Sequence, residues 1–104
     1  MKYTISEPRI LKVIMNYLDD ELGGLEKHSE NILDTTYQYW ADGDRKVIEI
    51  GELTDEGEIR VGIDDGVWNS FRNTFKLSPT ATYRYLKIWM KNNIGVDPHY
   101  IYHY

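Results

Sequence analysis

Hydrophobic residues recur at three- and four-residue spacing near the start of the chain and predict one amphipathic helix. Ile10, Ile14 and Leu18 share one side of this helix, and polar residues lie mostly opposite. Ser6 is placed to cap the N-terminus, and two consecutive glycines at 23–24 stop the pattern. A helix over residues 7–22 follows. Residues 25–34 lack a clean period, and we interpret them as a connection.

The middle of the chain changes to a pattern typical of strands. Segments 35–41, 46–53 and 58–63 are rich in aromatic and β-branched residues, and short polar turns at 42–44 and 54–57 separate them. In the last segment Ile59, Val61 and Ile63 alternate with polar residues, which gives one apolar face. These segments predict a three-stranded antiparallel β-meander.

Two further helices are predicted over residues 67–76 and 79–93, where they can cover the apolar face of the sheet. Trp68, Phe71 and Phe75 recur at helical intervals in the first, while Ser78 caps the second and Pro79 begins it. In the tail, residues 96–104, residue character alternates along the chain. This segment is either a short C-terminal edge strand or a loose arm. The prediction is therefore a single α+β domain over residues 1–104.

Composition excludes several kinds of site and indicates where such a domain is located in the cell. The chain has no cysteine, which excludes disulfides, zinc–thiolate sites and thiol nucleophiles. The first residues carry no apolar leader segment, and no apolar run approaches the roughly 20 residues of a membrane span. We therefore expect a cytoplasmic protein without membrane association.

The net charge of −5 is unevenly distributed along the chain. Residues 1–65 hold sixteen acidic and seven basic residues, whereas residues 66–96 hold five basic residues and no acidic one. This asymmetry can steer a charged partner or a second copy of the chain. The alternative is that the basic segment docks on the acidic half of the same molecule.

The last predicted helix carries the most suggestive candidate binding residues. Steps of 100° place Arg84, Lys87 and Lys91 in one narrow sector, flanked by Tyr83 and Tyr85. Cations for phosphates beside aromatic rings for bases would suit nucleic acid. Equally, basic residues are common on any exposed helix face, and three are few for a dedicated binder.

Aromatic residues supply the second candidate surface. Nine tyrosines and three tryptophans exceed what one small core can bury, and Tyr100, Tyr102 and Tyr104 cluster in the tail. Tyrosine is enriched at protein interfaces because it offers a large contact area at low entropic cost. The tail therefore predicts an interface with a protein partner or with another copy, unless its rings merely line the edge of the core.

Catalytic and metal-binding signatures are missing from the sequence. The acidic clusters do not follow the order of a calcium loop, and an extended tail would hold His99 and His103 about 13 Å apart at 3.3 Å per residue. Glu49 and Glu52 could meet Arg60, although nothing singles them out. We predict no cofactor, no metal and no enzymatic activity.

The leading hypothesis is therefore a small non-enzymatic module that binds a protein partner or assembles with itself into a homo-oligomer. The alternative hypothesis is a nucleic-acid-binding domain that uses the basic helix. Residues 1–7 resemble the start of small phage reading frames, a resemblance that implies no function.

Overall fold

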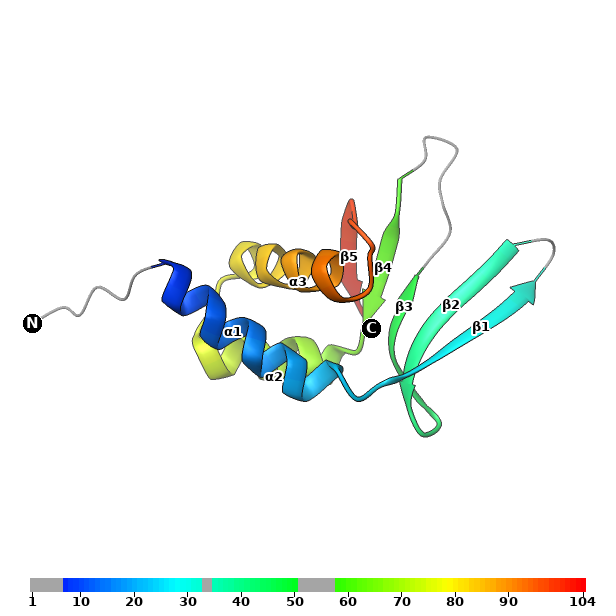
Figure 1. Cartoon of the computed structure of the whole chain (residues 1–104), viewed down its shortest axis with the longest axis horizontal. Coiled ribbons are helices and arrows are strands. Elements are labelled where there is room, and N and C mark those ends of the chain that lie inside the picture. The colour runs from blue at the N-terminus through cyan, green and yellow to red at the C-terminus, as the bar shows by residue number, and fades with distance from the viewer. Residues whose placement is uncertain (1–6, 33–34, 51–57) are drawn as a thin grey trace, which may run out of the picture.

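The computed structural model describes residues 7–32, 35–50 and 58–104. This part of the chain forms three helices and five strands. Four strands follow the first helix, and two helices precede the last strand (Figure 1). In chain order they are α1 (Glu7–Leu22), β1 (Glu26–Ile32), β2 (Thr35–Asp42), β3 (Arg45–Ile50), β4 (Arg60–Ile63), α2 (Asp65–Phe75), α3 (Pro79–Asn93) and β5 (Tyr100–His103).

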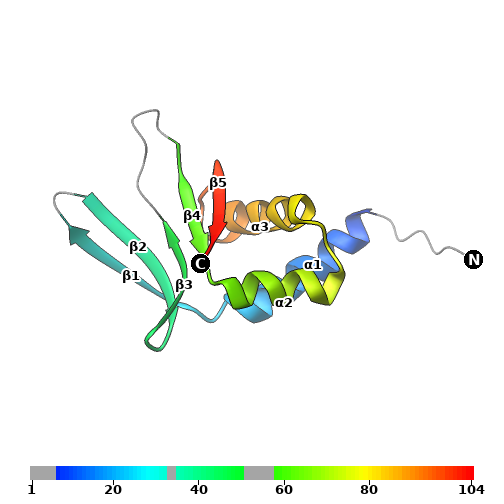
Figure 2. The same cartoon turned by 180° about the vertical axis from the view of Figure 1, so that it is seen from behind.

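The strands form one mixed sheet in the order β1-β2-β3-β4-β5. The first four strands pair antiparallel with their neighbours, and β5 pairs parallel to β4. The parallel pair arises because α2 and α3 carry the chain back before β5 begins, and parallel neighbours need such a crossover. All three helices lie on one side of the sheet, and the β1–β2 hairpin projects beyond them (Figures 1 and 2).

A β-bulge allows consecutive residues of β3 to enter the core. Trp40 pairs with Ile48 but Ala41 pairs with Lys46, so Val47 is the extra residue. Val47 and Ile48 are both buried, at 4% and 0% exposed. The bulge thus lets β3 contribute two adjacent apolar side chains where a regular strand would contribute one.

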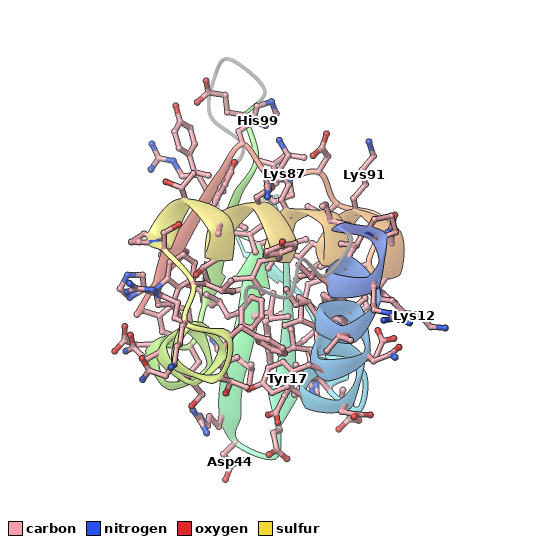
Figure 3. The ribbon with its side chains drawn as sticks, turned by 90° about the vertical axis from the view of Figure 1, so that its left-hand side faces the viewer. Lys12, Tyr17, Asp44, Lys87, Lys91 and His99 are labelled. Carbon is pink, nitrogen blue, oxygen red and sulfur yellow. The ribbon has the colours of Figure 1, made fainter. Side chains whose placement is uncertain are left out.

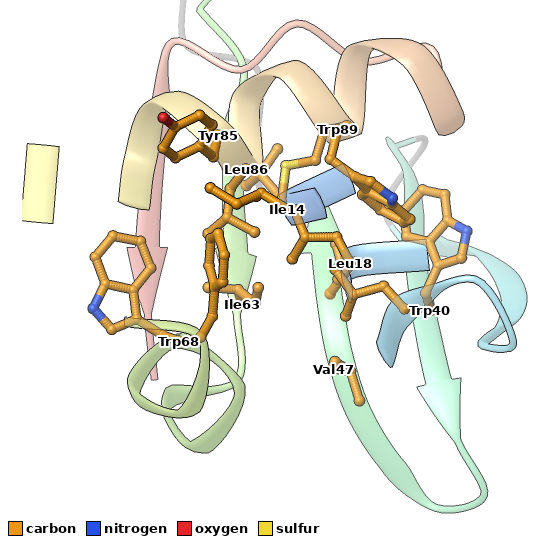
Figure 4. Close-up of a cluster of buried hydrophobic side chains, with 14 residues drawn as sticks. Ile14, Leu18, Trp40, Val47, Ile63, Trp68, Tyr85, Leu86 and Trp89 are labelled. Atoms are coloured by element: carbon orange, nitrogen blue, oxygen red, sulfur yellow. The ribbon is translucent and has the colours of Figure 1, made fainter. Parts of the chain in front are cut away.

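The core fills the space between the helices and the covered face of the sheet. Ile14 and Leu18 of α1 and Leu86 of α3 are almost fully buried in it. Figure 4 shows Trp68 at one end of the cluster and Trp40 with Trp89 at the other. The Trp89 indole N–H donates to Asp19 Oδ1 at 2.8 Å, which links α3 to α1 and satisfies the polar atom of a buried ring.

The α+β class is confirmed, with the first and third helices at the predicted residues and a C-terminal strand in the tail. The interpretation of residues 25–34 as a connection is wrong, because β1 occupies Glu26–Ile32 and the sheet has more strands than the predicted meander. β1 lies at the edge of a hairpin that projects beyond the helices, so burial imposes no apolar alternation on it. The Ser6 cap, the end of the second predicted strand and the turn at 54–57 lie outside the described residues.

No helix in the described part of the chain is long and apolar enough to cross a membrane. The structure therefore gives no sign of a transmembrane helix over residues 7–32, 35–50 and 58–104.

Asp64 stabilises the connection between β4 and α2. Its carboxylate caps the helix by accepting the Val67 backbone N–H at 3.2 Å, and it pairs with the guanidinium of Arg45 from β3. The hydrogen bond from Arg45 is the main reason that the pKa of Asp64 lies below its ordinary value. One side chain therefore links β3, β4 and α2.

We expect Asp64→Ala to lower the free energy of unfolding by about 1–2 kcal/mol through loss of the cap. Asp64→Asn keeps a capping oxygen and should lose less. Because the pKa of Asp64 is lowered by folding, its charge stabilises the protein above the ordinary value of 3.8, and this contribution disappears as the pH falls below it. Urea titrations of the three proteins at neutral and acidic pH measure both effects. Equal losses for the two variants at neutral pH would contradict the capping role.

Candidate functional site: the open face of the sheet

The strand register divides the side chains of the sheet between two faces. Trp40, Ile48 and Ile63 occupy one cross-strand row and face the helices. The neighbouring row points the opposite way, because successive residues of a strand alternate. We call this surface the open face; its described members are His28, Tyr39, Lys46, Glu49, Arg60, Gly62, Tyr100, Tyr102 and Tyr104.

Tyr102 lies on the edge strand β5, and its side chain crosses β4 to reach β3. Glu49, Gly62 and Tyr102 stand in one cross-strand row, and the Tyr102 hydroxyl donates to Glu49 Oε1 at 2.9 Å. A Cβ atom at Gly62 would lie 2.7–2.9 Å from the ring atoms and hydroxyl of Tyr102. The missing side chain at position 62 is therefore what allows the ring to lie across β4.

The neighbouring tyrosines extend this aromatic surface along β5. The Tyr104 hydroxyl donates to the backbone oxygen of Lys46 at 3.1 Å, and the Tyr104 and Tyr102 ring centroids are 6.3 Å apart. The guanidinium of Arg60 lies 5.9 Å from the Tyr100 ring centroid. The three tyrosines remain 50%, 38% and 45% exposed in the order 100, 102, 104, so their rings are shared between the sheet and solvent.

A second aromatic group lies on β1 and β2. The His28 and Tyr39 rings stack with centroids 5.0 Å apart and planes 12° apart. The Lys46 ammonium lies 4.7 Å from the Tyr39 centroid, a cation–π geometry. The open face thus carries aromatic rings near both edges of the sheet, with Lys46 and Glu49 of β3 between them.

Burial and nearby acidic groups keep two of the tyrosines protonated far into the alkaline range. Partial burial, followed by the hydrogen bond to Glu49, raises the pKa of Tyr102 to about 12. Burial and then the negative charges of Glu49 and Asp64 raise the pKa of Tyr104 to about 12. Both hydroxyls are therefore neutral hydrogen-bonding groups at physiological pH.

The predicted interface residues of the tail lie on the open face. Tyr100, Tyr102 and Tyr104 belong to or directly follow β5, and the tail is an edge strand of its own sheet. The last residue is held at both backbone groups, since its N–H donates to Ile63 and its carbonyl accepts from Asp65. The tail therefore presents its rings from a fixed position.

The predicted nucleic-acid contacts on α3 do not form one surface, because the basic residues are exposed or half-buried whereas Tyr85 is buried. Arg84 and Lys91 are exposed, and the Lys87 ammonium lies 3.6 Å from Asp97 Oδ1. Figure 3 shows Lys87 and Lys91 on the outer side of α3. Tyr85 is only 8% exposed, with Arg84 over its ring at 5.5 Å. The Tyr83 hydroxyl donates to the His99 backbone oxygen at 2.8 Å. Both tyrosines thus hold α3 in place within the fold.

The two tail histidines hold β5 to its neighbours. The Ile59 backbone N–H donates to His99 Nδ1 at 3.1 Å. His103 Nδ1 pairs with Asp65, and its ring stacks on Trp68 with centroids 4.9 Å apart. Within the described ranges, no three His, Cys, Asp or Glu residues gather closely enough to hold a metal ion.

Sequence reasoning missed three residues that shape the open face: His28, Tyr39 and Gly62. Gly62 carried a usable signal, because a glycine inside a strand often marks the close approach of another group. His28 offered none, because its strand was not recognised.

Comparisons with protein-family models, curated proteins and solved structures give no match to this chain. The functional argument therefore rests on the geometry of the open face.

We expect Gly62→Ala to displace the Tyr102 ring from β4, because the new Cβ would collide with it. The loss of the ring contacts and of the hydrogen bond to Glu49 should offset the gain of alanine over glycine in a strand. In a Tyr102→Ala background the same change should be neutral or slightly stabilising, since alanine suits a strand better than glycine. A double-mutant cycle, with unfolding free energies from urea titration, measures the coupling. Additive effects would show that the ring does not depend on the space above Gly62.

Alkaline titration should reveal two tyrosines with a pKa of about 12, against the ordinary value of 10.0. Because folding raises these values, their contribution to stability is complete below about pH 10 and is lost as the pH rises towards 12. Glu49→Gln removes the charge and should lower the pKa of Tyr102, which tyrosinate absorbance can follow. Tyr102→Phe identifies that step; an unchanged titration curve in either variant would contradict the assignment.

Proposed function

We propose that this chain is a non-enzymatic interaction module that binds a protein partner through the open face of its sheet. The observation that carries this proposal is that the helices cover only one face of the sheet. On the other face, Tyr100, Tyr102 and Tyr104 are held along β5 and remain in contact with solvent. A face of this kind is unusual for a sheet that only needs to fold, because polar residues would normally occupy it.

The chemistry of the open face suits protein more than any charged ligand. Its described cations, Lys46 and Arg60, lie over tyrosine rings, and Glu49 accepts a tyrosine hydroxyl. The surface thus combines aromatic area with hydrogen-bonding groups and has no large excess of either charge. Protein interfaces have this composition, with tyrosine and arginine over-represented at their centres.

Fixed side chains also favour tight binding. Association costs free energy for every side chain that must become ordered. Tyr102 and Tyr104 already hold one rotamer each through hydrogen bonds to β3. A partner that docks on them would not have to supply that ordering.

Nucleic acid remains the alternative partner, through Arg84, Lys87 and Lys91 of α3. The sequence suggested that Tyr83 and Tyr85 would stack on bases, but Tyr85 is buried and the Tyr83 hydroxyl is engaged by the backbone. Three cations would give a slope of only about −2 in a plot of log affinity for single strands against log salt concentration. The geometry therefore supports protein binding better.

Tyr100 is the best position for a test, because it is the most exposed of the three tail tyrosines. We expect Tyr100→Asp to weaken partner binding by about 30-fold or more, the range of an interface hot spot. Val13→Asp is the matched control, since Val13 is an equally exposed apolar residue, 52% exposed, on α1. Affinity isolation from a cell extract, quantified by mass spectrometry and repeated with the purified partner, compares the three proteins.

The proposal predicts a defined protein retained by the parent chain and by Val13→Asp but lost with Tyr100→Asp. Equal loss in both variants would indicate non-specific adhesion and reject the open face as the site. Retention of nuclease-sensitive material, abolished by charge reversal at Arg84, Lys87 and Lys91, would instead establish the alternative.

A further inference from the structure

The outer edge of β1 is the longest unpaired strand edge in the described part of the chain. β1 spans seven residues, Glu26–Ile32, and pairs only with β2, whereas the opposite edge strand β5 has four. No described element lies beyond β1, and its hairpin projects away from the helices (Figures 1 and 2). Such an edge presents backbone N–H and C=O groups that another strand can pair with.

We propose that two copies of this chain associate through antiparallel pairing of their β1 strands, with Ser29 on the two-fold axis. The two sheets then join into one continuous sheet with the helices of both copies on the same side.

Symmetry restricts the registers that such a dimer can use. A two-fold axis between antiparallel strands stands perpendicular to the sheet, so it preserves which face each residue occupies. Directly opposed residues must therefore come from the same face. One strand can slide past the other only in steps of two residues, and each step moves the two-fold axis by one residue.

Strand overlap and charge select the same register. With Ser29 opposite Ser29, all seven residues pair, and position 26 stands opposite 32, 27 opposite 31 and 28 opposite 30. This places histidine against glutamate and no charge against a like charge. The next register in one direction opposes Glu26 to Glu30, and in the other it opposes Glu30 to itself. Like charges directly opposite destabilise a strand pair, so of these three registers only the full one avoids a like-charge pair.

The polar sequence of β1 fits this arrangement. Charged residues on an edge strand discourage indiscriminate pairing. Here they discourage the shifted registers and permit the centred one. The dimer would also place the two open faces side by side on one surface, which extends the proposed function without depending on it.

Charge substitutions at the axis provide the test, because each would be opposed by its own copy. Light scattering and sedimentation across a concentration series should show a dimer for the full chain. Ser29→Lys and Ser29→Glu should each raise the dissociation constant about fivefold or more. An equimolar mixture of the two variants should restore dimers, because lysine then faces glutamate. Thr80→Lys, an exposed change on the first turn of α3, is the matched control and should leave the dimer intact.

Two results would overturn the inference: a parent chain that stays monomeric at every concentration, or a dimer that Ser29→Lys and Ser29→Glu leave unchanged. Restoration in the mixture excludes misfolding as the reason for dissociation, since both variants must fold to pair. Failure here is separable from failure of the proposed function, because Tyr100→Asp should leave the dimer intact while Ser29→Lys should retain the partner.

Discussion

The packing of all three helices on one side of the sheet leaves the other face to be stabilised by the sheet's own side chains. A chain of 104 residues buries one cluster of apolar side chains, and here that cluster lies between the helices and the row of Trp40, Ile48 and Ile63. A sheet with one bare face usually carries short polar residues there. This chain instead carries tyrosine rings that lie against the strands, and the hydroxyls of Tyr102 and Tyr104 are hydrogen-bonded to β3.

Tyr102 shows how that is achieved. Its ring covers the backbone of β4 at Gly62, and its hydroxyl finds Glu49 two strands away. The contact ties β5 directly to β3, with which β5 has no backbone pairing. His103 makes a corresponding link on the opposite face by stacking on Trp68. β5, although only four residues long, is therefore held by side chains on both faces as well as by its parallel ladder.

The parts of this fold that local patterning encodes could be predicted from sequence. α1 and α3 each have an apolar stripe and a stop signal in the sequence, Ser78 caps α3, and both helices form at the predicted residues. The residues that escaped prediction depend on distant neighbours. β1 lacks an apolar alternation and forms by pairing with β2, and Gly62 matters because of a tyrosine forty residues later in the chain. For the same reason, only part of the candidate site could be predicted from the sequence. The tail tyrosines could be recognised by composition, whereas His28 and Tyr39 become part of the site only once β1 is paired.

The two surfaces proposed for interaction use different chemistry, and this bears on how they would work together. The open face would recognise its partner through side chains, whereas the β1 edge would pair through its backbone and use charge only to select a register. Edge pairing adds strands within the plane of the sheet, so it leaves both open faces uncovered and turned the same way. A partner with two matching sites would then meet a second open face at high effective concentration after binding the first, and its apparent affinity would rise without any new contact.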